Sequence, residues 1–183
     1  MPDSIWTATL EQFRDRVASI EPVPAGVTAV AVSATFALAL LSKVLLVTRK
    51  HKDFAGNPEL IGGLLERARE TSQTLSQLAD DDIAAFQEYL DCLRRKQPTG
   101  AAVRKTIDVP LKVARVAASG IELCEEARGH IHAVVAPDLG IAAGLLAGAV
   151  RSTLITVEAN LQHLPESDPF RIDATTQAGR LAI

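Results

Sequence analysis

The feature that most limits how this chain can fold is an uncharged run that extends from Pro22 to Ser42. A run of this length forms either a helix that crosses a membrane or a helix that is buried at the centre of a bundle. Alanine, serine and threonine are frequent in the run, and Lys43 follows it directly. We therefore expect a buried helix in a soluble protein, with a membrane anchor as the less favoured alternative.

The composition indicates helices rather than sheets. Hydrophobic residues make up 48% of the chain, but aromatic residues make up only 4%. Alanine, leucine and valine therefore supply most of the packing, which favours close-packed helices over a sheet sandwich. With 183 residues the chain is long enough to bury its own core. We expect one all-α domain that spans residues 1–183 and forms an antiparallel helical bundle.

The pattern of apolar residues divides the chain into helical segments separated by polar breaks. Leu10, Phe13 and Val17 have helical spacing, and Thr9 is placed to cap this helix with Gln12 reaching back to it. The tail after the Pro165–Pro169 loop is short and polar, and the pattern leaves its helical state open. The remaining predicted helices cover 25–50, 59–94, 101–128 and 138–164, with an interruption or restart near Pro110.

Three glycines mark one face of the last strong helix. Gly140, Gly144 and Gly148 recur every four residues, so they lie close together on that face. Small residues at this spacing allow another helix backbone to approach closely. We expect a tight helix crossing there.

The charge and the cysteine content indicate which partners the protein can bind and in which cellular compartment it works. The net charge of −3 and a pI near 5.8 give no general attraction to nucleic acid. Cys92 and Cys124 form no C-x-x-C pair, which is typical of reduced thiols in a cytoplasmic protein. The segment from Met1 to Arg16 is polar and of mixed charge, so we predict no secretory signal.

The densest group of carboxylates is Asp80-Asp81-Asp82. Successive residues of a helix point about 100° apart, so these three side chains cannot all face one site. A solvated helix face is the simpler interpretation. A member drawn into a pocket would have a raised pKa and would suit proton transfer. Asp138 is a second candidate for proton transfer, because it follows Pro137 and opens an apolar helix, where it is equally suited to be the N-cap.

The basic run Arg49-Lys-His-Lys52 follows the uncharged helix. Cations complement the C-terminus of a helix, and they also suit an anionic part of a ligand.

His130 and His132 have poor spacing for metal ligands on a helix, and we predict no metal site. The chain contains no P-loop, no G-x-G-x-x-G and no G-x-S-x-G, so nucleotide binding and serine hydrolysis lack support.

Several different short motifs follow one another in a distinctive order along nearly the whole chain. They are Phe13, Pro22-Val-Pro-Ala-Gly-Val-Thr-Ala29, Arg49-Lys-His-Lys52, Leu78-Ala-Asp-Asp-Asp-Ile-Ala-Ala-Phe86, Asp108-Val-Pro-Leu111, Pro137-Asp-Leu-Gly-Ile-Ala142, Arg151-Ser152 and Val157-Glu-Ala-Asn160. In order and spacing the series resembles the cyclodeaminase and methenyltetrahydrofolate cyclohydrolase family, of which this chain looks like a divergent member.

The resemblance implies an all-helical, cyclodeaminase-like homodimer that binds a tetrahydrofolate near the loop before the second helix. Members of the family either hydrolyse the methenyl bridge of the folate to a formyl group or close a formimino group to that bridge with release of ammonia. Both reactions pass through a tetrahedral carbon between two folate nitrogens. A positioned acid/base therefore suffices, without a metal or a cofactor beyond the folate substrate.

The resemblance also implies roles for individual residues. Asp82 or Asp138 would transfer the proton. The residues expected to bind the substrate are Gly26, Thr28, Lys50, Lys52 and Asn160, with the two lysines attracting its glutamate tail.

The chain departs from the family pattern at several positions. The family usually has Pro-Gly-Gly-Gly-Ser where this chain has Pro24-Ala-Gly-Val-Thr28, so Ala25 and Val27 are expected to crowd a ligand if the glycines allowed close approach or a positive φ. The other replacements are Leu45, Arg49, His132-Ala-Val134 and Pro137. We favour a cyclohydrolase because no formimino-transferring domain is attached. The alternative is a non-catalytic or repurposed helical dimer that binds folate or another small molecule.

Overall fold

The structure is a computed structural model that describes residues 4–182. The described residues form six α-helices and two short 3-10 helices and contain no strand, which confirms the all-α prediction. In chain order the elements are η1 (Ile5–Thr7), α1 (Leu10–Val17), α2 (Gly26–Lys50), α3 (Pro58–Arg94), α4 (Gly100–Ala127), η2 (Ala133–Val135), α5 (Ala136–Leu161) and α6 (Pro169–Leu181).

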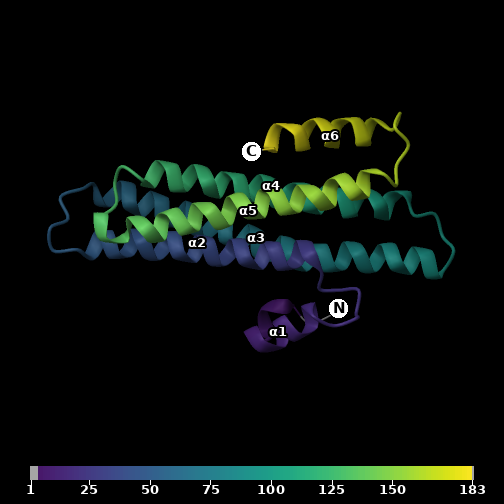
Figure 1. Cartoon of the computed structure of the whole chain (residues 1–183), viewed down its shortest axis with the longest axis horizontal. Helices are drawn as coiled ribbons and strands as arrows, with labels where there is room; N and C mark the ends of the chain where they lie inside the picture. The colour runs from purple at the N-terminus through teal and green to yellow at the C-terminus, as the bar shows by residue number, and fades with distance from the viewer. Residues whose placement is uncertain (1–3, 183) are drawn as a thin grey trace.

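The four long helices form an antiparallel ring (Figure 1). α2 packs against α3, α3 against α4, α4 against α5, and α5 returns to α2. α6 lies outside the ring against α4 and α5, while α1 lies apart from it on the other side (Figure 1). The predicted antiparallel bundle is therefore confirmed.

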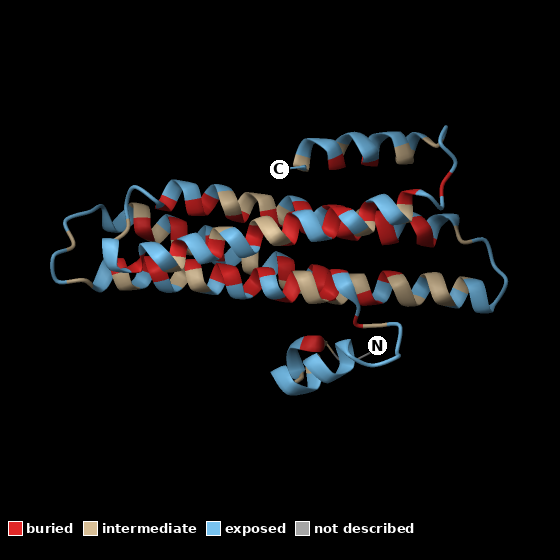
Figure 2. Cartoon of the chain, in the orientation of Figure 1, coloured by how far each residue is buried: buried red, intermediate tan, exposed pale blue. Residues whose placement is uncertain are grey.

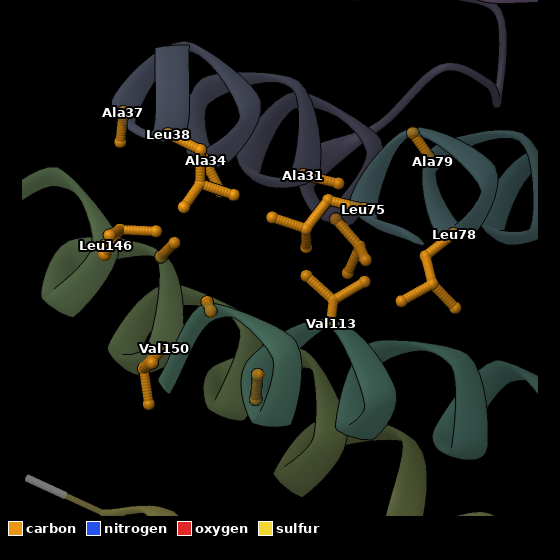
Figure 3. Packing of buried hydrophobic residues seen from close by; sticks show 14 of the residues in the cluster. Ala31, Ala34, Ala37, Leu38, Leu75, Leu78, Ala79, Val113, Leu146 and Val150 are labelled. Carbon is orange, nitrogen blue, oxygen red and sulfur yellow. The ribbon is translucent and has the colours of Figure 1, made fainter. Parts of the chain in front are cut away.

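The core is built largely from alanine, leucine and valine, as the composition predicts. α2 contributes Ala31, Ala34 and Leu38, each without exposed surface, and they face apolar side chains of α3, α4 and α5 (Figure 3). Small alanine side chains let the helix axes approach, while leucines fill the space between them. α2 is thus the central helix that the uncharged run predicts.

The capping prediction for the first helix is correct. The Thr9 hydroxyl accepts a hydrogen bond from the Gln12 backbone N–H at 3.1 Å, and the Gln12 side chain accepts one from the Thr9 N–H at 2.8 Å. This reciprocal pair satisfies two N–H groups that have no partner within the helix.

The predicted break at Pro110 is wrong, because α4 runs without interruption from Gly100 to Ala127. A proline has no N–H, so the carbonyl of Thr106, four residues earlier, lacks its usual helical partner. The side-chain amide of Asn160 on α5 donates a hydrogen bond to this carbonyl at 2.7 Å. The missing bond is thus replaced from a neighbouring helix, and α4 continues.

Within one chain, the glycine-rich face of α5 makes no tight helix crossing, and a crossing against a second copy of the chain stays a prediction. Gly140 and Gly144 are exposed, and a Cβ atom built on either of them or on Gly148 would meet no atom within 4 Å. Figure 2 shows exposed residues along this outward side of α5. The small residues therefore lie on the surface of the bundle.

Two helices, α2 and the segment from Ala133 to Leu161 that includes α5, are long and apolar enough to cross a membrane by length and composition. In the most apolar 18-residue stretch of α2, 50% is buried inside the bundle, and in the corresponding stretch of the second segment 33% is buried. Both helices thus combine a buried face with an outward face that is apolar.

Candidate functional site

A pocket of about 200 Å³ lies where the start of α2 meets α3, α4 and α5. All four helices of the ring therefore contribute to it. It is lined by Val23, Ala25, Gly26, Val27, Asp82, Phe86, Thr106, Thr156 and Asn160.

The three neighbouring aspartates of α3 have different partners. Asp80 accepts hydrogen bonds from the Ser4 hydroxyl at 2.7 Å and from the Ile5 N–H at 3.1 Å. Asp81 accepts one from the side-chain amide of Gln77 at 3.0 Å. Only Asp82 lines the pocket, so helix geometry separates the cluster as predicted and one member is drawn into a site.

Asp82 is held by Thr28 at the start of α2. The Thr28 hydroxyl donates a hydrogen bond to the Asp82 carboxylate at 2.7 Å. Burial raises the pKa of Asp82 above its ordinary value of 3.8, and the hydroxyl and backbone N–H of Thr28 oppose this rise by donating to the ionised form. A raised pKa brings a carboxyl group closer to the pH range in which it can both release and take up a proton during catalysis.

The same contact completes the start of α2. The N-cap residue Ala25 has no side chain that can accept a hydrogen bond, and the helix has no acidic residue in its first turn. The Asp82 carboxylate, which comes from α3, takes the role of the missing capping group at the start of α2. The first N–H groups of a helix attract negative charge, so a carboxylate is suited to this position. Asp82 therefore has a structural role as well as a place in the pocket.

Gly26 is the first residue of α2 and lines the pocket. A Cβ atom at this position would meet nothing within 4 Å, so the fold itself does not require glycine here. The space beside Gly26 instead remains available to a ligand.

We predict that Gly26→Ala leaves the fold intact and weakens binding of a ligand in the pocket. The free energy of unfolding should stay the same or rise by up to about 1 kcal/mol, because alanine restricts the unfolded chain. Binding should weaken by about 1 to 3 kcal/mol, since the methyl group occupies ligand space. Urea unfolding and ligand titration measure the two effects. Gly63→Ala, at an open helical position outside the pocket, is the matched control, and equal affinities in both variants would contradict the prediction.

The structure places Asn160 at the pocket, as expected for a substrate-binding residue. Its side-chain N–H₂ group is already engaged with the Thr106 carbonyl. Its side-chain oxygen accepts no hydrogen bond from the described residues, and it is the part of Asn160 that remains for a ligand.

Asp138 lies far from Asp82 within the chain. Its carboxylate is 3.2 Å from the Nζ atom of Lys43, near the surface of the bundle. Gly26 and Lys43 are separated by about 25 Å along α2. The two aspartates that were candidates for proton transfer therefore do not share a site in one chain.

The suggested capping role of Asp138 is also wrong. α5 begins at Ala136, its N-cap is Val135, and no side chain caps it. Pro137 and Asp138 lie within the first turn, where an acidic residue still favours the helix N-terminus.

Lys50 and Lys52 lie at the opposite end of α2 from Gly26, about 36 Å away along the helix. Lys50 lines a groove of about 970 Å³ between the second half of α2 and α3, and Lys52 is exposed in the following loop. The structure therefore divides the predicted substrate residues into two groups. Gly26, Thr28, Asp82 and Asn160 come together, while Lys50 and Lys52 do not join them within the chain.

The histidines take part in loop packing. His132 stacks on His51 with the ring centroids 3.7 Å apart, and its backbone N–H donates to the Thr48 hydroxyl at 3.0 Å. His130 is exposed in the preceding turn. Within residues 4–182 no three histidine, cysteine or acidic side chains are grouped as a metal site would need.

The replaced family glycines cause no backbone strain. Ala25 has an extended conformation with φ −124°, and none of the described glycines has a positive φ. Ala25 and Val27 both line the pocket. Val27 is buried there and Ala25 is exposed. Leu45 is fully buried in the core, far from the pocket along α2.

Sequence reasoning missed three polar or aromatic residues of the pocket, Phe86, Thr106 and Thr156. Two of them carried a usable signal, because residues four apart on a helix share a face. Phe86 is four residues after Asp82, and Thr156 is four residues before Asn160. Thr106 carried no such signal, because its link to the pocket residue Asn160 is a hydrogen bond between two helices.

Comparisons with known proteins agree with the fold and identify the family. Residues 9–176 match the model of the formiminotransferase-cyclodeaminase family. The chain is 27% identical over 169 residues to a methenyltetrahydrofolate cyclohydrolase of Methylorubrum extorquens, a match that covers 86% of this chain and 81% of the relative. The crystal structure of a formiminotetrahydrofolate cyclodeaminase from Thermotoga maritima has the same fold, with a TM-score of 0.90 at 24% identity over 97% of this chain and 89% of that one. The protein belongs to the formiminotransferase-cyclodeaminase family.

Proposed function

We propose that the protein is a cytoplasmic, homodimeric enzyme that hydrolyses 5,10-methenyltetrahydrofolate to a formyltetrahydrofolate, with Asp82 as the acid/base. The observation that carries the proposal is the position of Asp82, a carboxyl group of raised pKa that lines a pocket at an exposed helix start. The similarity to a methenyltetrahydrofolate cyclohydrolase supports the choice of substrate.

The proposed reaction begins when a water oxygen adds to the methenyl carbon and the Asp82 carboxylate takes a proton from that water. The resulting carbon is tetrahedral and carries a hydroxyl group between two folate nitrogens. Asp82 then returns the proton to one nitrogen, the carbon–nitrogen bond breaks, and the hydroxyl proton is released as the formyl group forms. One residue of suitable pKa therefore serves both proton transfers, and the folate is the only organic group involved.

The related cyclodeamination is the second candidate, and the close match to the fold of a formiminotetrahydrofolate cyclodeaminase favours it. In this reaction one folate nitrogen attacks the formimino carbon, and a protonated amino group leaves as ammonia. Asp82 would take the proton from the attacking nitrogen and give it to the leaving one. The geometry of the tetrahedral carbon is the same in both reactions.

The experiment that tests the proposal follows methenyltetrahydrofolate absorbance with purified protein, corrected for uncatalysed hydrolysis. Loss of absorbance above background is the expected result. A rise of the same absorbance with formiminotetrahydrofolate, together with released ammonia, would favour cyclodeamination instead. Correctly folded protein that does neither would overturn the enzymatic proposal and favour a repurposed binding protein.

We predict that Thr28→Val moves the pH profile of turnover to higher pH. The Thr28 hydroxyl lowers the pKa of Asp82, so its removal lets burial raise that pKa further. The limb of the kcat profile that reports Asp82 should move upward whether the residue acts as acid or base. Thr35→Val is the matched control, because Thr35 is also buried on α2 but donates to the Val32 carbonyl. Equal profiles for the two variants would contradict the assignment of Asp82.

A further inference from the structure

One buried hydroxyl group among the described residues has no hydrogen-bond partner. Thr153 on α5 has no exposed surface, and its hydroxyl oxygen makes no hydrogen bond to any of residues 4–182. The hydroxyls of three other buried threonines, Thr28, Thr35 and Thr106, each donate to an oxygen of the protein. A buried hydroxyl that is left unpaired destabilises a fold, so Thr153 indicates a partner that is not a protein group.

Thr153 lies on the face of α5 that borders the Asp82 pocket. The residues of α5 that line this pocket are Thr156 and Asn160. Thr153 is seven residues before Asn160, so the two side chains leave the helix in directions only about 20° apart. Thr153 and Thr156 are three residues apart and are neighbours on the helix surface. The Thr153 hydroxyl therefore lies at the floor of the pocket, about one turn closer to the middle of the bundle than Thr156.

The start of α2 gives the depth of Thr153 relative to Asp82. α2 and α5 are antiparallel (Figure 1), and Gly26 of α2 and Thr156 of α5 line the same pocket. Thr28 is two residues further along α2, so it is level with the part of α5 that contains Thr153. The Thr28 hydroxyl is bonded to the Asp82 carboxylate. The carboxylate and the unpaired hydroxyl thus belong to the same layer of the bundle.

These three side chains match the hydrogen-bonding positions of one water molecule. The Thr153 hydroxyl can donate to the water oxygen, which gives this buried group its missing partner. The two water protons can point to the Thr156 oxygen and to the Asp82 carboxylate, which has lone pairs left beside the bond from Thr28. Buried waters typically make about three hydrogen bonds to polar groups of this kind. One lone pair of the water then remains and faces the open pocket.

We infer that Thr153 and Thr156 are positioning residues that hold the attacking water against Asp82 at the floor of the pocket. This inference rests on the proposed function. In the proposed reaction the free lone pair forms the new carbon–oxygen bond, and the electron pair of the carbon–nitrogen double bond moves to nitrogen. One water proton passes to the Asp82 carboxylate, to which it already points. The water is thus oriented before the folate arrives.

A crystal structure at atomic resolution tests the water site directly. It should show a water oxygen within about 3.2 Å of the hydroxyl oxygens of both Thr153 and Thr156. A threonine hydroxyl in a helix can instead bond to the carbonyl four residues earlier, which for Thr153 is that of Ala149. A Thr153 hydroxyl bonded to this carbonyl, with no water between the two threonines, would overturn the inference.

Urea unfolding tests the same site without any measurement of activity. Thr153→Val keeps the shape of the side chain and removes the hydroxyl, so the unfolding midpoint should fall as the water loses its partner. The fall should be smaller in a chain that already carries Thr156→Val, because both hydroxyls bind the same water. Thr35→Val is the matched control, since Thr35 is buried about 10 Å along α2 from Thr28 and its effect should add independently. A rise of the midpoint in Thr153→Val, as removal of an unpaired hydroxyl would give, would overturn the inference.

Kinetics separates the water site from the role of Asp82. Thr153→Val and Thr156→Val should each lower kcat on methenyltetrahydrofolate by about 10- to 100-fold, because the water is no longer oriented. KM should change far less, and Thr153→Ser, which keeps a hydroxyl, should keep most of the turnover. Thr35→Val should match the wild type.

The outcomes distinguish a failure of this inference from a failure of the proposed function. Wild-type kcat in Thr153→Val would overturn the positioning role of this residue and leave Asp82 as the acid/base. A folded wild type without turnover would overturn the proposed function and the attacking role of the water. The crystal structure and the unfolding midpoints would still decide whether Thr153 and Thr156 hold a water.

Discussion

Asp82→Asn is expected to lower turnover by a factor of about 10² to 10⁴, because an amide cannot exchange protons as a carboxyl group does. The fold should persist, since the asparagine oxygen can still accept the hydrogen bond from the Thr28 hydroxyl. Steady-state kinetics on methenyltetrahydrofolate measures the effect. Asp81→Asn is the matched control, because Asp81 is the adjacent residue of the same helix and is bonded to Gln77 outside the pocket. Wild-type turnover in Asp82→Asn would show that another group moves the proton.

The same variant should be more stable than the wild type at neutral pH. The pKa of Asp82 is raised in the folded state, so below pH 3.8 the group is protonated in both states and contributes no pH-dependent difference. As the pH rises through the interval between 3.8 and the folded pKa, the unfolded state releases the proton first and the wild type loses stability. Asparagine removes this loss. Urea unfolding at acid and neutral pH should therefore show a gain in the variant that disappears in acid, and a constant difference would contradict the raised pKa.

The second large effect is expected at Asn160, which satisfies the carbonyl left free by Pro110. Asn160→Ala should lower the free energy of unfolding by about 1 to 3 kcal/mol, because the buried Thr106 carbonyl loses its hydrogen bond. Denaturant unfolding with an unchanged m-value measures this cost.

Pro110→Ala provides the control for this explanation. Alanine restores an N–H group at position 110, which can donate to the Thr106 carbonyl along α4. The cost of Asn160→Ala should therefore be smaller in the Pro110→Ala background, with a coupling free energy of about 0.5 to 3 kcal/mol. Equal costs in the two backgrounds would show that Asn160 stabilises the protein by another route.

Local signals were sufficient to predict most of the fold. The α2 prediction of 25–50 agrees with Gly26–Lys50, and the predicted 59–94 agrees with Pro58–Arg94. In these segments apolar periodicity and the flanking proline or glycine all indicate the same boundaries. The continuity of α4 could not be predicted in the same way, because the hydrogen bond that replaces the one lost at Pro110 comes from Asn160, 54 residues after Thr106.

The site was only partly predictable for a similar reason. Helix geometry correctly separated Asp80, Asp81 and Asp82, but local spacing cannot show which one a neighbouring helix covers. The resemblance grouped Asp138, Lys50 and Lys52 with Asp82, although within one chain they lie at the other end of the bundle. Motifs carry no information on whether two residues meet in the same chain or across two chains.

The dependence of α2 on Asp82 has a consequence for the order of folding. The residue that stands in for its N-cap is 54 positions further along the sequence, so the first turn of α2 gains this support only after α3 has docked. The amides of that turn should exchange with solvent more readily whenever the helix pair loosens, even while the rest of α2 stays protected. The stability of the first turn of α2, which borders the pocket, thus depends on α3, an element that follows later in the sequence.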